Sequence, residues 1–366
     1  MYVEGKAKIR DSGKAFLNPK AQASRDISVA YVSQLAQKGA SLLDATAATG
    51  IRGIRYSLES KIKKPTLTEI NPTAYRALKS NLLLNKVKAT ALNMSIQEFA
   101  NTADERFDFI DLDPFGGISP YIYDLMKISG DGTRLMVTAT DTAVLCGADS
   151  KACMKLYDSK PVHNELCHEG GMRVMIGYIA RVAAQFDMRI DVELSISYLH
   201  YLRSFIRFTA GAKAAYSSLE KMGYLRYCDK CCNRETEPGF LPKATECKNC
   251  GARMASYGRM WAGPIKGQKV VDSIYDAIMD DESKKEAAKL IGTIKAELDV
   301  PFYYHIPTLT KRYRTSSVSP YAVMERLAKL GHSCSLTHME GSAIRTNAGL
   351  GIVVSCIKGL KGMAAP

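Results

Sequence analysis

The sequence predicts an α/β fold over residues 1–211, followed by an α+β C-terminal domain over residues 212–366. In the first 211 residues, short apolar runs typical of strands alternate with helix-periodic segments. Such alternation indicates a mainly parallel sheet with helices on both faces. The second half contains two Cys-x2-Cys motifs and ends in a helix, helix, hairpin pattern. These features predict a metal ribbon and a further small α+β segment.

The strands of the expected sheet are short apolar runs bounded by small or polar residues. They lie at residues 41–44, 66–69, 90–93, 107–111 and 133–139, and two further apolar runs lie at 191–197 and 205–208. A helix is expected from Ile51, because Ile51, Ile54 and Leu58 have helical spacing. Asn71-Pro72 then supplies a helix cap with proline in the first turn, and a third helix covers residues 173–186.

Composition and charge limit the class of protein. Of the 366 residues, 46% are hydrophobic, which suffices for two or three domains with a sizeable core. No apolar run reaches transmembrane length and the N-terminus is polar and basic, so a cytoplasmic protein without membrane contact is expected. The net charge of +13 favours an anionic macromolecule such as nucleic acid as partner, and no obligate protein partner is evident.

Residues 44–50 form a small-residue loop between an expected strand and an expected helix. Asp44 ends the strand and Gly50 precedes the helix. Small side chains let a nucleotide-like ligand approach the backbone, and the helix N-terminus offers free N–H groups. Glu69 ends the next strand, where an acid can accept hydrogen bonds from both ribose hydroxyls. The alternative interpretation is an ordinary turn and a surface glutamate.

The stretch "DLDPFGG", residues 111–117, lies where another apolar strand enters a turn. In an open α/β sheet, ligands bind at the ends of such strands. Asp111 and Asp113 are therefore candidate site residues, together with the rigid Pro114 and the aromatic Phe115. The alternative is a turn in which Asp113 caps the following helix.

The order of these motifs resembles that of class I S-adenosylmethionine-dependent methyltransferases. Asp113-Pro114-Phe115 is similar to the Asp/Asn-Pro-Pro-aromatic box of enzymes that methylate the exocyclic amines of bases. A set of five blocks makes the likeness closer: "NPKAQASRDISVAY", "DATAATGIRGIRYSLE", "DLDPFGG", "VTATDTAVLCGA" and "ELCHEGGMRV". Together they resemble the archaeal and eukaryotic tRNA (guanine-26, N2)-dimethyltransferase family. The resemblance implies a Rossmann-like methyltransferase domain over residues 1–211 and a tRNA-binding domain over residues 212–366.

The resemblance also implies how S-adenosylmethionine is bound. Arg25 and Arg52 would contact the methionine carboxylate, whose two oxygens match a guanidinium fork. Glu69 would hold the ribose, and Ser95 and Ile96 would flank the adenine. Asp111 would orient its loop or help to hold the cofactor. Thr46 and Ala48 stand where most class I methyltransferases have glycine, a departure that the dimethyltransferase family shares.

The same resemblance assigns the chemistry to Asp113, Pro114, Phe115 and Phe16. Guanine N2 is a poor nucleophile because its lone pair is delocalised into the ring. The Asp113 carboxylate and the Pro114 carbonyl would accept hydrogen bonds from the amine, and proline fixes φ, which helps to aim its carbonyl. Phe115 and Phe16 would stack on the two faces of the base. A stacked guanine must first be flipped out of the tRNA.

The two cysteine pairs predict a zinc ribbon over about residues 224–260. Cys228 and Cys231 form the first pair, Cys247 and Cys250 the second, with fifteen residues between the pairs. This spacing is typical of a tetrahedral four-thiolate zinc site. A closed site of four cysteines makes the zinc structural rather than catalytic. Cys232 is a further thiol that could compete with Cys231.

Residues 300–366 predict a winged-helix-like segment that binds RNA. A charged helical tract, residues 271–298, precedes it, and the expected hairpin turns at Glu340-Gly341. Basic residues there suit phosphate contacts. The candidates are Lys311, Arg312, Arg314 and Arg345. The alternative is a solvated charged face.

The leading hypothesis from the sequence is transfer of one or two methyl groups from S-adenosylmethionine to N2 of guanine-26 in tRNA. One alternative is an exocyclic-amine methyltransferase that acts on another RNA position or on DNA. Another is a catalytically silent RNA-binding zinc protein. Intact Gly50, Glu69 and Asp113 argue against the silent protein.

Overall fold

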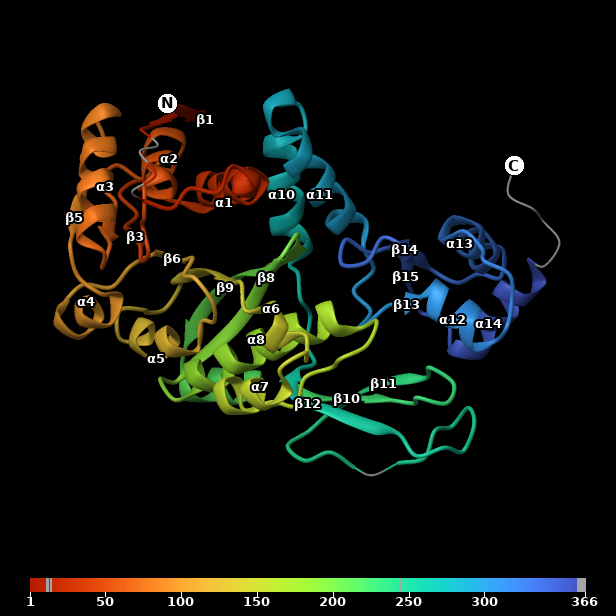
Figure 1. Cartoon of the computed structure of the whole chain (residues 1–366). Helices are drawn as coiled ribbons and strands as arrows, with labels where there is room; N and C mark the ends of the chain where they lie inside the picture. The colour runs from red at the N-terminus through yellow and green to blue at the C-terminus, as the bar shows by residue number, and fades with distance from the viewer. Residues whose placement is uncertain (11–12, 14, 244, 361–366) are drawn as a thin grey trace.

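A seven-stranded mixed sheet forms the centre of the first 210 residues (Figure 1). The computed structural model describes residues 1–10, 13, 15–243 and 245–360. The sheet has the order β5-β4-β3-β6-β7-β9-β8. Its strands are β3 (Leu42–Asp44), β4 (Thr66–Thr68), β5 (Thr90–Leu92), β6 (Phe109–Leu112), β7 (Arg134–Ala139), β8 (Met188–Tyr198) and β9 (Tyr201–Ala210). The first five are parallel, and β9 runs antiparallel to both β7 and β8.

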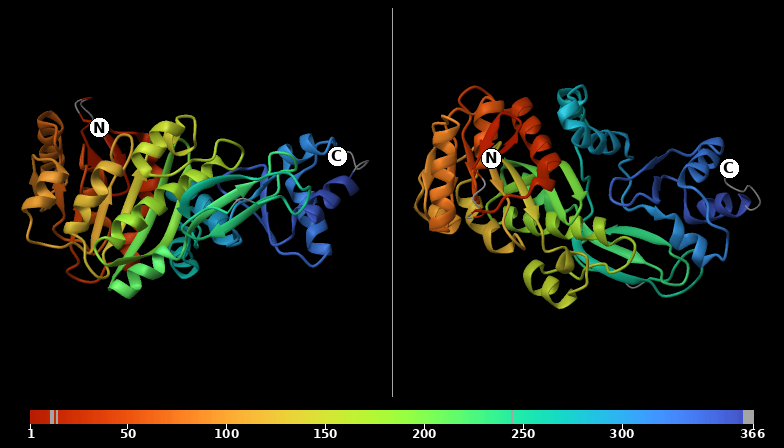
Figure 2. Two further views of the ribbon diagram at one scale, coloured as in Figure 1. Left: turned by 90° about the horizontal axis from the view of Figure 1, so that it is seen from below. Right: turned by 45° about the horizontal axis from the view of Figure 1, so that its top comes forward.

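Helices cover both faces of this sheet (Figure 2). They include α1 (Gln22–Leu35), α2 (Ile51–Glu59), α3 (Pro72–Leu84), α4 (Ile96–Thr102), α5 (Ser119–Lys127) and α8 (Cys167–Ala184). Successive strand residues point to opposite faces. In β6, Phe109 packs in the hydrophobic cluster that contains α1, whereas Ile110 packs in the cluster that contains α4, α5 and α8. Because both faces of the sheet are buried, its strands require continuous apolar runs rather than an alternation of apolar and polar residues.

The helix and strand predictions for residues 41–208 are confirmed, with shifts at the ends. Asn71 caps α3, its side chain accepting from the N–H groups of Thr73 and Ala74. The third predicted helix begins at Cys167 rather than at Arg173. Gly170 and Gly171 lie inside it because their neighbours are close: a Cβ on Gly171 would lie 3.1 Å from the Leu145 carbonyl oxygen. Two short helices, α6 (Thr142–Leu145) and α7 (Ser150–Tyr157), precede it.

An N-terminal hairpin, β1 (Tyr2–Glu4) and β2 (Ala7–Ile9), packs against α2 and α3. Glu4 at its end is buried and accepts hydrogen bonds from Arg25 of α1 and Arg55 of α2. A buried carboxylate is tolerated only when it is paired in this way. The hairpin is thereby fixed beside the helices that follow β3.

A three-stranded antiparallel sheet follows the helix α9 (Ala212–Leu219). It has the order β11-β10-β12 and consists of β10 (Met222–Tyr227), β11 (Arg234–Pro238) and β12 (Ala255–Trp261). This sheet lies against α8, where a Cβ on Gly177 would meet the Trp261 backbone nitrogen at 2.9 Å. The absence of a side chain at Gly177 therefore allows close packing of helix on strand.

The charged tract expected at residues 271–298 is two helices rather than one. They are α10 (Gln268–Ile278) and α11 (Lys285–Ala296). Asp281 interrupts the tract because its side chain accepts from the Ser283 N–H and starts a short 3-10 turn, Glu282–Lys284. Both helices pack on α1, with Val271 and Ile291 in the same hydrophobic cluster as Tyr31. They thus cover a face of the large sheet, although they follow residue 211.

The last described part of the chain contains the predicted order of helix, helix and hairpin. Its elements are β13 (Tyr304–His305), α12 (Ile306–Arg312), α13 (Pro320–Lys329), β14 (Cys334–Leu336), β15 (Ala343–Thr346) and α14 (Leu350–Gly359). The sheet order is β13-β15-β14. The sequence pattern did not predict β13 or the apolar α14. Residues 361–366 of the expected winged-helix-like segment lie outside the described residues.

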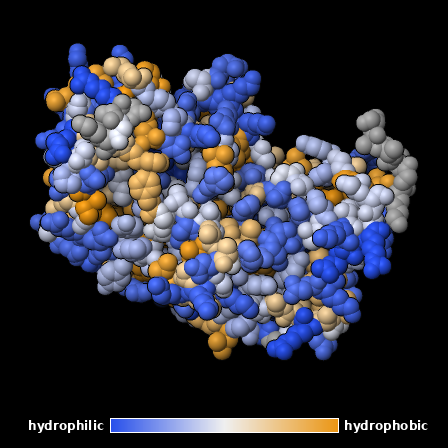
Figure 3. Space-filling view, viewed as in Figure 1, coloured by the Kyte–Doolittle hydropathy of each residue, from blue (hydrophilic) through white to orange (hydrophobic). Residues whose placement is uncertain are grey.

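The outer surface is mainly polar on the face drawn in Figure 3, with apolar residues only in small groups. None of the helices in the described part of the chain is both long enough and apolar enough to span a membrane.

Candidate active site

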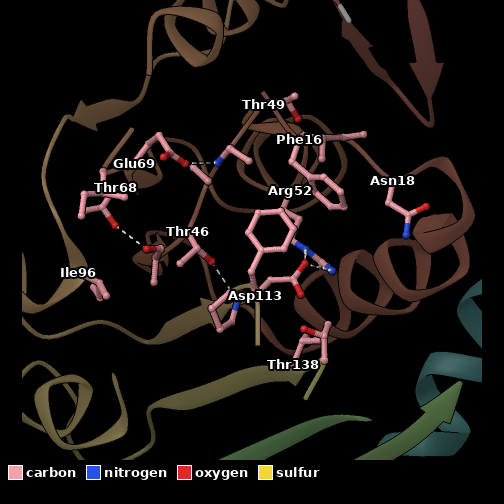
Figure 4. A pocket seen from close by; sticks show the side chains of 18 of the residues that line it. Phe16, Asn18, Thr46, Thr49, Arg52, Thr68, Glu69, Ile96, Asp113 and Thr138 are labelled. Atoms are coloured by element: carbon pink, nitrogen blue, oxygen red, sulfur yellow. Dashed lines mark hydrogen bonds and ion pairs between the residues drawn. The ribbon is translucent and has the colours of Figure 1, made fainter. Parts of the chain in front are cut away.

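A cavity of about 510 Å³ opens at the carboxyl ends of β3, β4, β6 and β7 (Figure 4). Its size is within the ~300–1,000 Å³ usual for small-molecule sites. Nine of the predicted site residues line it: Phe16, Arg25, Arg52, Glu69, Ser95, Ile96, Asp113, Pro114 and Phe115. The parallel strands bring these residues together because their carboxyl ends share one edge of the sheet.

Gly50 shapes the loop between β3 and α2 without lining the cavity. Its φ of 81° is in the left-handed region, which favours glycine, and a Cβ there would meet Leu78 at 2.3 Å. The next βα loop is joined to this one through Glu69, whose Oε2 accepts from the Ala48 N–H at 2.8 Å. The other oxygen, Oε1, accepts from the Asn71 N–H at 2.7 Å. The Glu69 carboxylate is thus fixed at the cavity wall before any ligand binds.

Asp113 lies at the other end of the cavity and is held by Arg52. Arg52 donates from Nε at 2.9 Å and from Nη2 at 2.7 Å, both to Asp113 Oδ2 (Figure 4). The Asp113 N–H donates to Thr46 Oγ1 at 3.0 Å, which ties the two loops together. Burial opposes ionisation of Asp113, but the charges of Arg52 and Arg203 outweigh it and lower the pKa of this carboxyl. Asp113 is therefore an ionised hydrogen-bond acceptor at neutral pH.

Asp44 and Asp111 lie beneath the cavity floor and are not part of its lining. Asp44 Oδ2 accepts from the Gly53 N–H at 3.0 Å. Burial, with a further contribution from the Asp111 charge, raises the pKa of Asp44 to about 7. Asp111 is fully buried, with Arg203 Nη2 at 2.9 and 3.0 Å from its two oxygens and a short hydrogen bond from Tyr56.

Asp44 and Asp111 are absent from the cavity lining, and the position of Asp111 fits the expectation that it orients its loop. Both oxygens of Asp111 and Oδ2 of Asp44 accept hydrogen bonds inside the protein, whereas Oδ1 of Asp44 has no partner among the described residues. Asp111 also lies 3.7 Å from Nη1 of Arg52. These acids position the loops and Arg52, which in turn line the cavity.

Phe16 and Phe115 stand at the mouth of the cavity. Both rings are exposed, 55% for Phe16 and 74% for Phe115, which is unusual for side chains of this size. Their centroids are 4.6 Å apart and their planes meet at 75°, an edge-to-face contact. The turn that carries Phe115 is rigid, since Thr140 Oγ1 accepts from the Gly116 N–H at 2.8 Å.

Arg25 lines the cavity, but its guanidinium is already engaged. Nε and Nη2 donate to the two oxygens of Glu4 at 2.7 and 2.5 Å, and Nη2 also donates to the Asn18 carbonyl. A direct role in binding the methionine carboxylate would therefore rely on its remaining N–H groups. Arg52 is better placed, because its Nη1 has no hydrogen-bond partner within the described residues.

Several buried polar atoms around the cavity lack partners. Besides Nη1 of Arg52, these are Ser24 Oγ, Thr49 Oγ1 and Tyr201 Oη; none makes a well-aligned hydrogen bond to a described residue, although Ser24 and Tyr201 lie close to each other. Buried polar groups are normally paired, so orphans around one cavity indicate a polar ligand. A zwitterionic ligand with hydroxyl groups fits this set and the Glu69 carboxylate opposite it. The sequence motifs identified neither Ser24 nor Tyr201 as a site residue. Ser24 could have been found because it directly precedes Arg25, whereas no sequence signal indicated Tyr201.

The chain is similar to known proteins over nearly its whole length. Residues 1–358 match a family model described as N2,N2-dimethylguanosine tRNA methyltransferase. The chain belongs to this family. The tRNA (guanine(26)-N(2))-dimethyltransferase of Thermococcus kodakarensis is 35% identical over 360 residues, 94% of this chain and 93% of the relative. The protein of that name from Pyrococcus horikoshii is 35% identical over 384 residues and covers 97% of each chain.

A solved structure has the same fold over nearly the whole chain. It is Trm1 from Pyrococcus horikoshii in complex with S-adenosyl-L-methionine. The TM-score is 0.90 at 33% identity, and the match covers 98% of this chain and 99% of the other. The class I methyltransferase fold and the family that the sequence motifs resemble are confirmed.

The four paired cysteines of this family member form one cluster. Their sulfur atoms all lie within 4.8 Å of one another, and the Cys228–Cys250 and Cys231–Cys247 pairs are 3.5 Å apart. Tetrahedral zinc–thiolate bonds of ~2.3 Å place sulfurs roughly 3.8 Å apart, so the donor set and its spacing fit structural zinc. Cys232 is not part of this cluster.

The basic residues predicted to bind RNA divide into two groups. Lys311, Arg312 and Arg314 are exposed at and after the end of α12. The prediction for Arg345 is wrong, because this side chain is 1% exposed. Its guanidinium lies 2.9 Å from Glu169 and 3.2 Å from Glu297 and joins α8 to the C-terminal segment. A buried arginine held by two carboxylates has no surface to offer to a phosphate.

Proposed function

We propose that this chain transfers methyl groups from S-adenosylmethionine to the exocyclic N2 of guanine-26 in tRNA. Family membership over residues 1–358 supports the reaction. The location of the site rests on one observation: Glu69 and the Asp113-Pro114-Phe115 turn line the same cavity. A cofactor and a base can then meet within one cavity.

In this proposal the cofactor lies along the β3 and β4 ends of the cavity. Glu69 accepts hydrogen bonds from the ribose hydroxyls, while Ser95 and Ile96 flank the adenine. Arg52, through Nη1, binds the methionine carboxylate, and Ser24, Thr49 and Tyr201 supply further polar contacts. The cofactor supplies a methyl group bonded to a positively charged sulfonium sulfur. The neutral thioether that remains after transfer is the leaving group, and it needs no protonation by an acid.

The target base occupies the mouth of the cavity. The Asp113 carboxylate and the Pro114 carbonyl accept hydrogen bonds from the N2 amine, which increases electron density on that nitrogen. The N2–CH3 bond forms as the S–CH3 bond breaks, and the amine proton leaves with or after transfer. Catalysis then rests mainly on holding N2 in line with the methyl group.

The two rings at the mouth must move to admit the base. A base stacked between two rings needs about 7 Å between them, twice the contact distance of ~3.5 Å. Phe16 and Phe115 are instead in mutual edge contact, with centroids 4.6 Å apart. We infer that Phe16 swings away, because the Phe115 turn is fixed by Thr140. The two aromatic rings then cover the two faces of the base.

In this proposal the two halves of the chain have different roles. Residues 1–211 form the methyltransferase domain and residues 212–366 the tRNA-binding domain, with zinc bound by Cys228, Cys231, Cys247 and Cys250. Lys311, Arg312 and Arg314 contact tRNA phosphates, a role that their exposure and positive charge support. The net charge of +13 is consistent with a polyanionic substrate.

A substrate comparison distinguishes this function from its runner-up, methylation of DNA or of another RNA position. The chain is incubated with labelled S-adenosylmethionine and, separately, with unmodified tRNA, single-stranded DNA of equal length and an unstructured RNA. Label should enter the tRNA at least tenfold faster than either of the others. Equal labelling of DNA would contradict the tRNA substrate, and cofactor binding without labelling of any substrate would support the silent RNA-binding protein.

A further inference from the structure

A second group of metal-ligand side chains lies apart from the paired cysteines. Cys146 directly follows α6 as its C-cap residue, and Cys167 and His168 are the first two residues of α8. The two sulfurs and a ring nitrogen of His168 all lie within 4.8 Å of one another. None of the three lines the methyl-transfer cavity, and the proposed chemistry uses none of them.

One ring nitrogen of His168 is held by the backbone. Its Nδ1 lies 3.2 Å from the backbone carbonyl of Met339, so Nδ1 carries the proton and donates to that oxygen. This tautomer leaves Nε2 with a lone pair. Metal-binding histidines usually donate their other ring N–H to a carbonyl or carboxylate in this way, which fixes the ring and raises its basicity.

The surroundings keep the three ligands in place. Glu169, the next residue of α8, is fully buried and accepts from the Phe302 N–H and from Arg173. On the other side, the Gly147 backbone is pressed against the Val162 carbonyl, where a Cβ would lie at 2.7 Å. The ligands thus sit on a helix end and a tight turn that cannot shift independently.

We propose that Cys146, Cys167 and His168 bind a second divalent metal ion of the zinc class, separate from the four-cysteine site. Two thiolates and one imidazole select a borderline-soft ion over magnesium or calcium. Three protein ligands leave one position of a tetrahedral ion open. Water can fill this position, because His163, whose Nδ1 lies 3.1 Å from the Cys146 carbonyl, is not part of the group.

The ion would link two parts of the molecule. Cys146 and Cys167 belong to the methyltransferase domain, whereas Met339, which orients His168, lies in the C-terminal segment between β14 and β15. An ion bound here therefore reinforces the junction that the buried Glu169–Arg345 pair already makes nearby. Loss of the ion should loosen the C-terminal segment without emptying the cofactor cavity.

Metal counting tests the proposal on the whole chain. The protein is purified under reducing conditions in the presence of zinc, freed of loosely bound metal and analysed for zinc per chain. Two zinc ions are expected for the wild type and one each for Cys146→Ser/Cys167→Ser and Cys247→Ser/Cys250→Ser. Cys334→Ser is the matched control and should retain two. A wild-type value of one overturns the proposal without reference to any variant.

Cobalt absorption identifies the ligands. Co2+ bound in the Cys247→Ser/Cys250→Ser background should show thiolate-to-cobalt charge transfer and the visible bands of a tetrahedral ion. Adding Cys167→Ser should remove most of this charge-transfer absorption, and His168→Ala should weaken cobalt binding at least tenfold. Unchanged spectra in both variants would overturn the assignment. A Cys146–Cys167 disulfide that persists in the freshly reduced protein would overturn it as well.

Discussion

Arg52 holds the carboxylate of Asp113 through two N–H groups, at 2.9 and 2.7 Å from the same oxygen. The third nitrogen, Nη1, is buried beside the cavity without a hydrogen-bond partner in the described part of the chain. One guanidinium thus stands between the expected position of the cofactor carboxylate and the acid that faces the base. Both N–H groups of Arg52 contact Oδ2 of Asp113, and Thr138 is a further neighbour of this carboxylate.

Asp113→Ala should reduce methyl transfer by at least a hundredfold, because it removes an acceptor for the guanine amine. The cofactor dissociation constant, measured by calorimetry, should change by no more than a few-fold, since Arg52 and Glu69 remain. Asp104→Ala, which alters an exposed acid, is the control and should leave both quantities unchanged. Near-normal turnover of Asp113→Ala would remove this residue from the mechanism.

Glu69→Ala should act chiefly on cofactor affinity. A hydrogen bond to a charged group contributes about 1.5–3 kcal/mol, so the dissociation constant should rise roughly 10- to 100-fold. Glu69 also holds the Ala48 N–H, so Glu69→Gln is the milder companion and should give a smaller increase. Glu98→Ala on α4 is the matched exposed control. An unchanged affinity in Glu69→Ala would refute the ribose assignment.

Removal of zinc from the four-cysteine site should destabilise the chain around β10–β12. Cys247→Ser/Cys250→Ser leaves only two thiolates, Cys228 and Cys231, which cannot hold zinc in a closed site. The variant should lose one zinc ion and unfold at a lower temperature in scanning calorimetry. Its cofactor affinity should remain within a few-fold, because the cavity belongs to the other sheet. A normally stable variant would show that the ribbon needs no metal.

Replacing Lys311, Arg312 and Arg314 together with alanine should weaken tRNA binding and flatten its salt dependence. Each lost phosphate contact removes about one unit from the slope of log affinity against log salt. The control is Lys61→Ala/Lys63→Ala/Lys64→Ala, which removes the same charge from exposed positions between α2 and β4. Equal effects of the two triple variants would indicate that net charge, rather than a surface at α12, governs binding.

The sequence predicted local elements well because their signals are local. Asn71-Pro72 caps α3 as expected, and the strand before Asp113 ends where proline and glycine require it. The cysteine spacing likewise anticipated a cluster whose sulfurs meet in space. Neighbouring residues carry such information, so no knowledge of distant packing is needed.

The sequence patterns could not predict ion pairs between residues that lie far apart along the chain. Arg345 reads as one more basic residue in a hairpin, yet Glu169 and Glu297, far away in the sequence, bury it. Similarly, Arg203 of β9 pairs with the buried Asp111, which also lies near Arg52, and no sequence pattern indicated this pairing. The packing of α10 and α11 on α1 also depends on tertiary contacts between distant segments.

Position-resolved mass spectrometry of the tRNA product shows directly whether the chain methylates N2 of guanine-26. An unmodified tRNA transcript is incubated with the chain and S-adenosylmethionine, digested and mapped. N2-methylated guanosine is expected at nucleotide 26, with none in a transcript that has adenine at that position and almost none with Asp113→Ala. Methylation confined to another nucleotide or to a ring nitrogen of guanine, or equal product from Asp113→Ala, would contradict it.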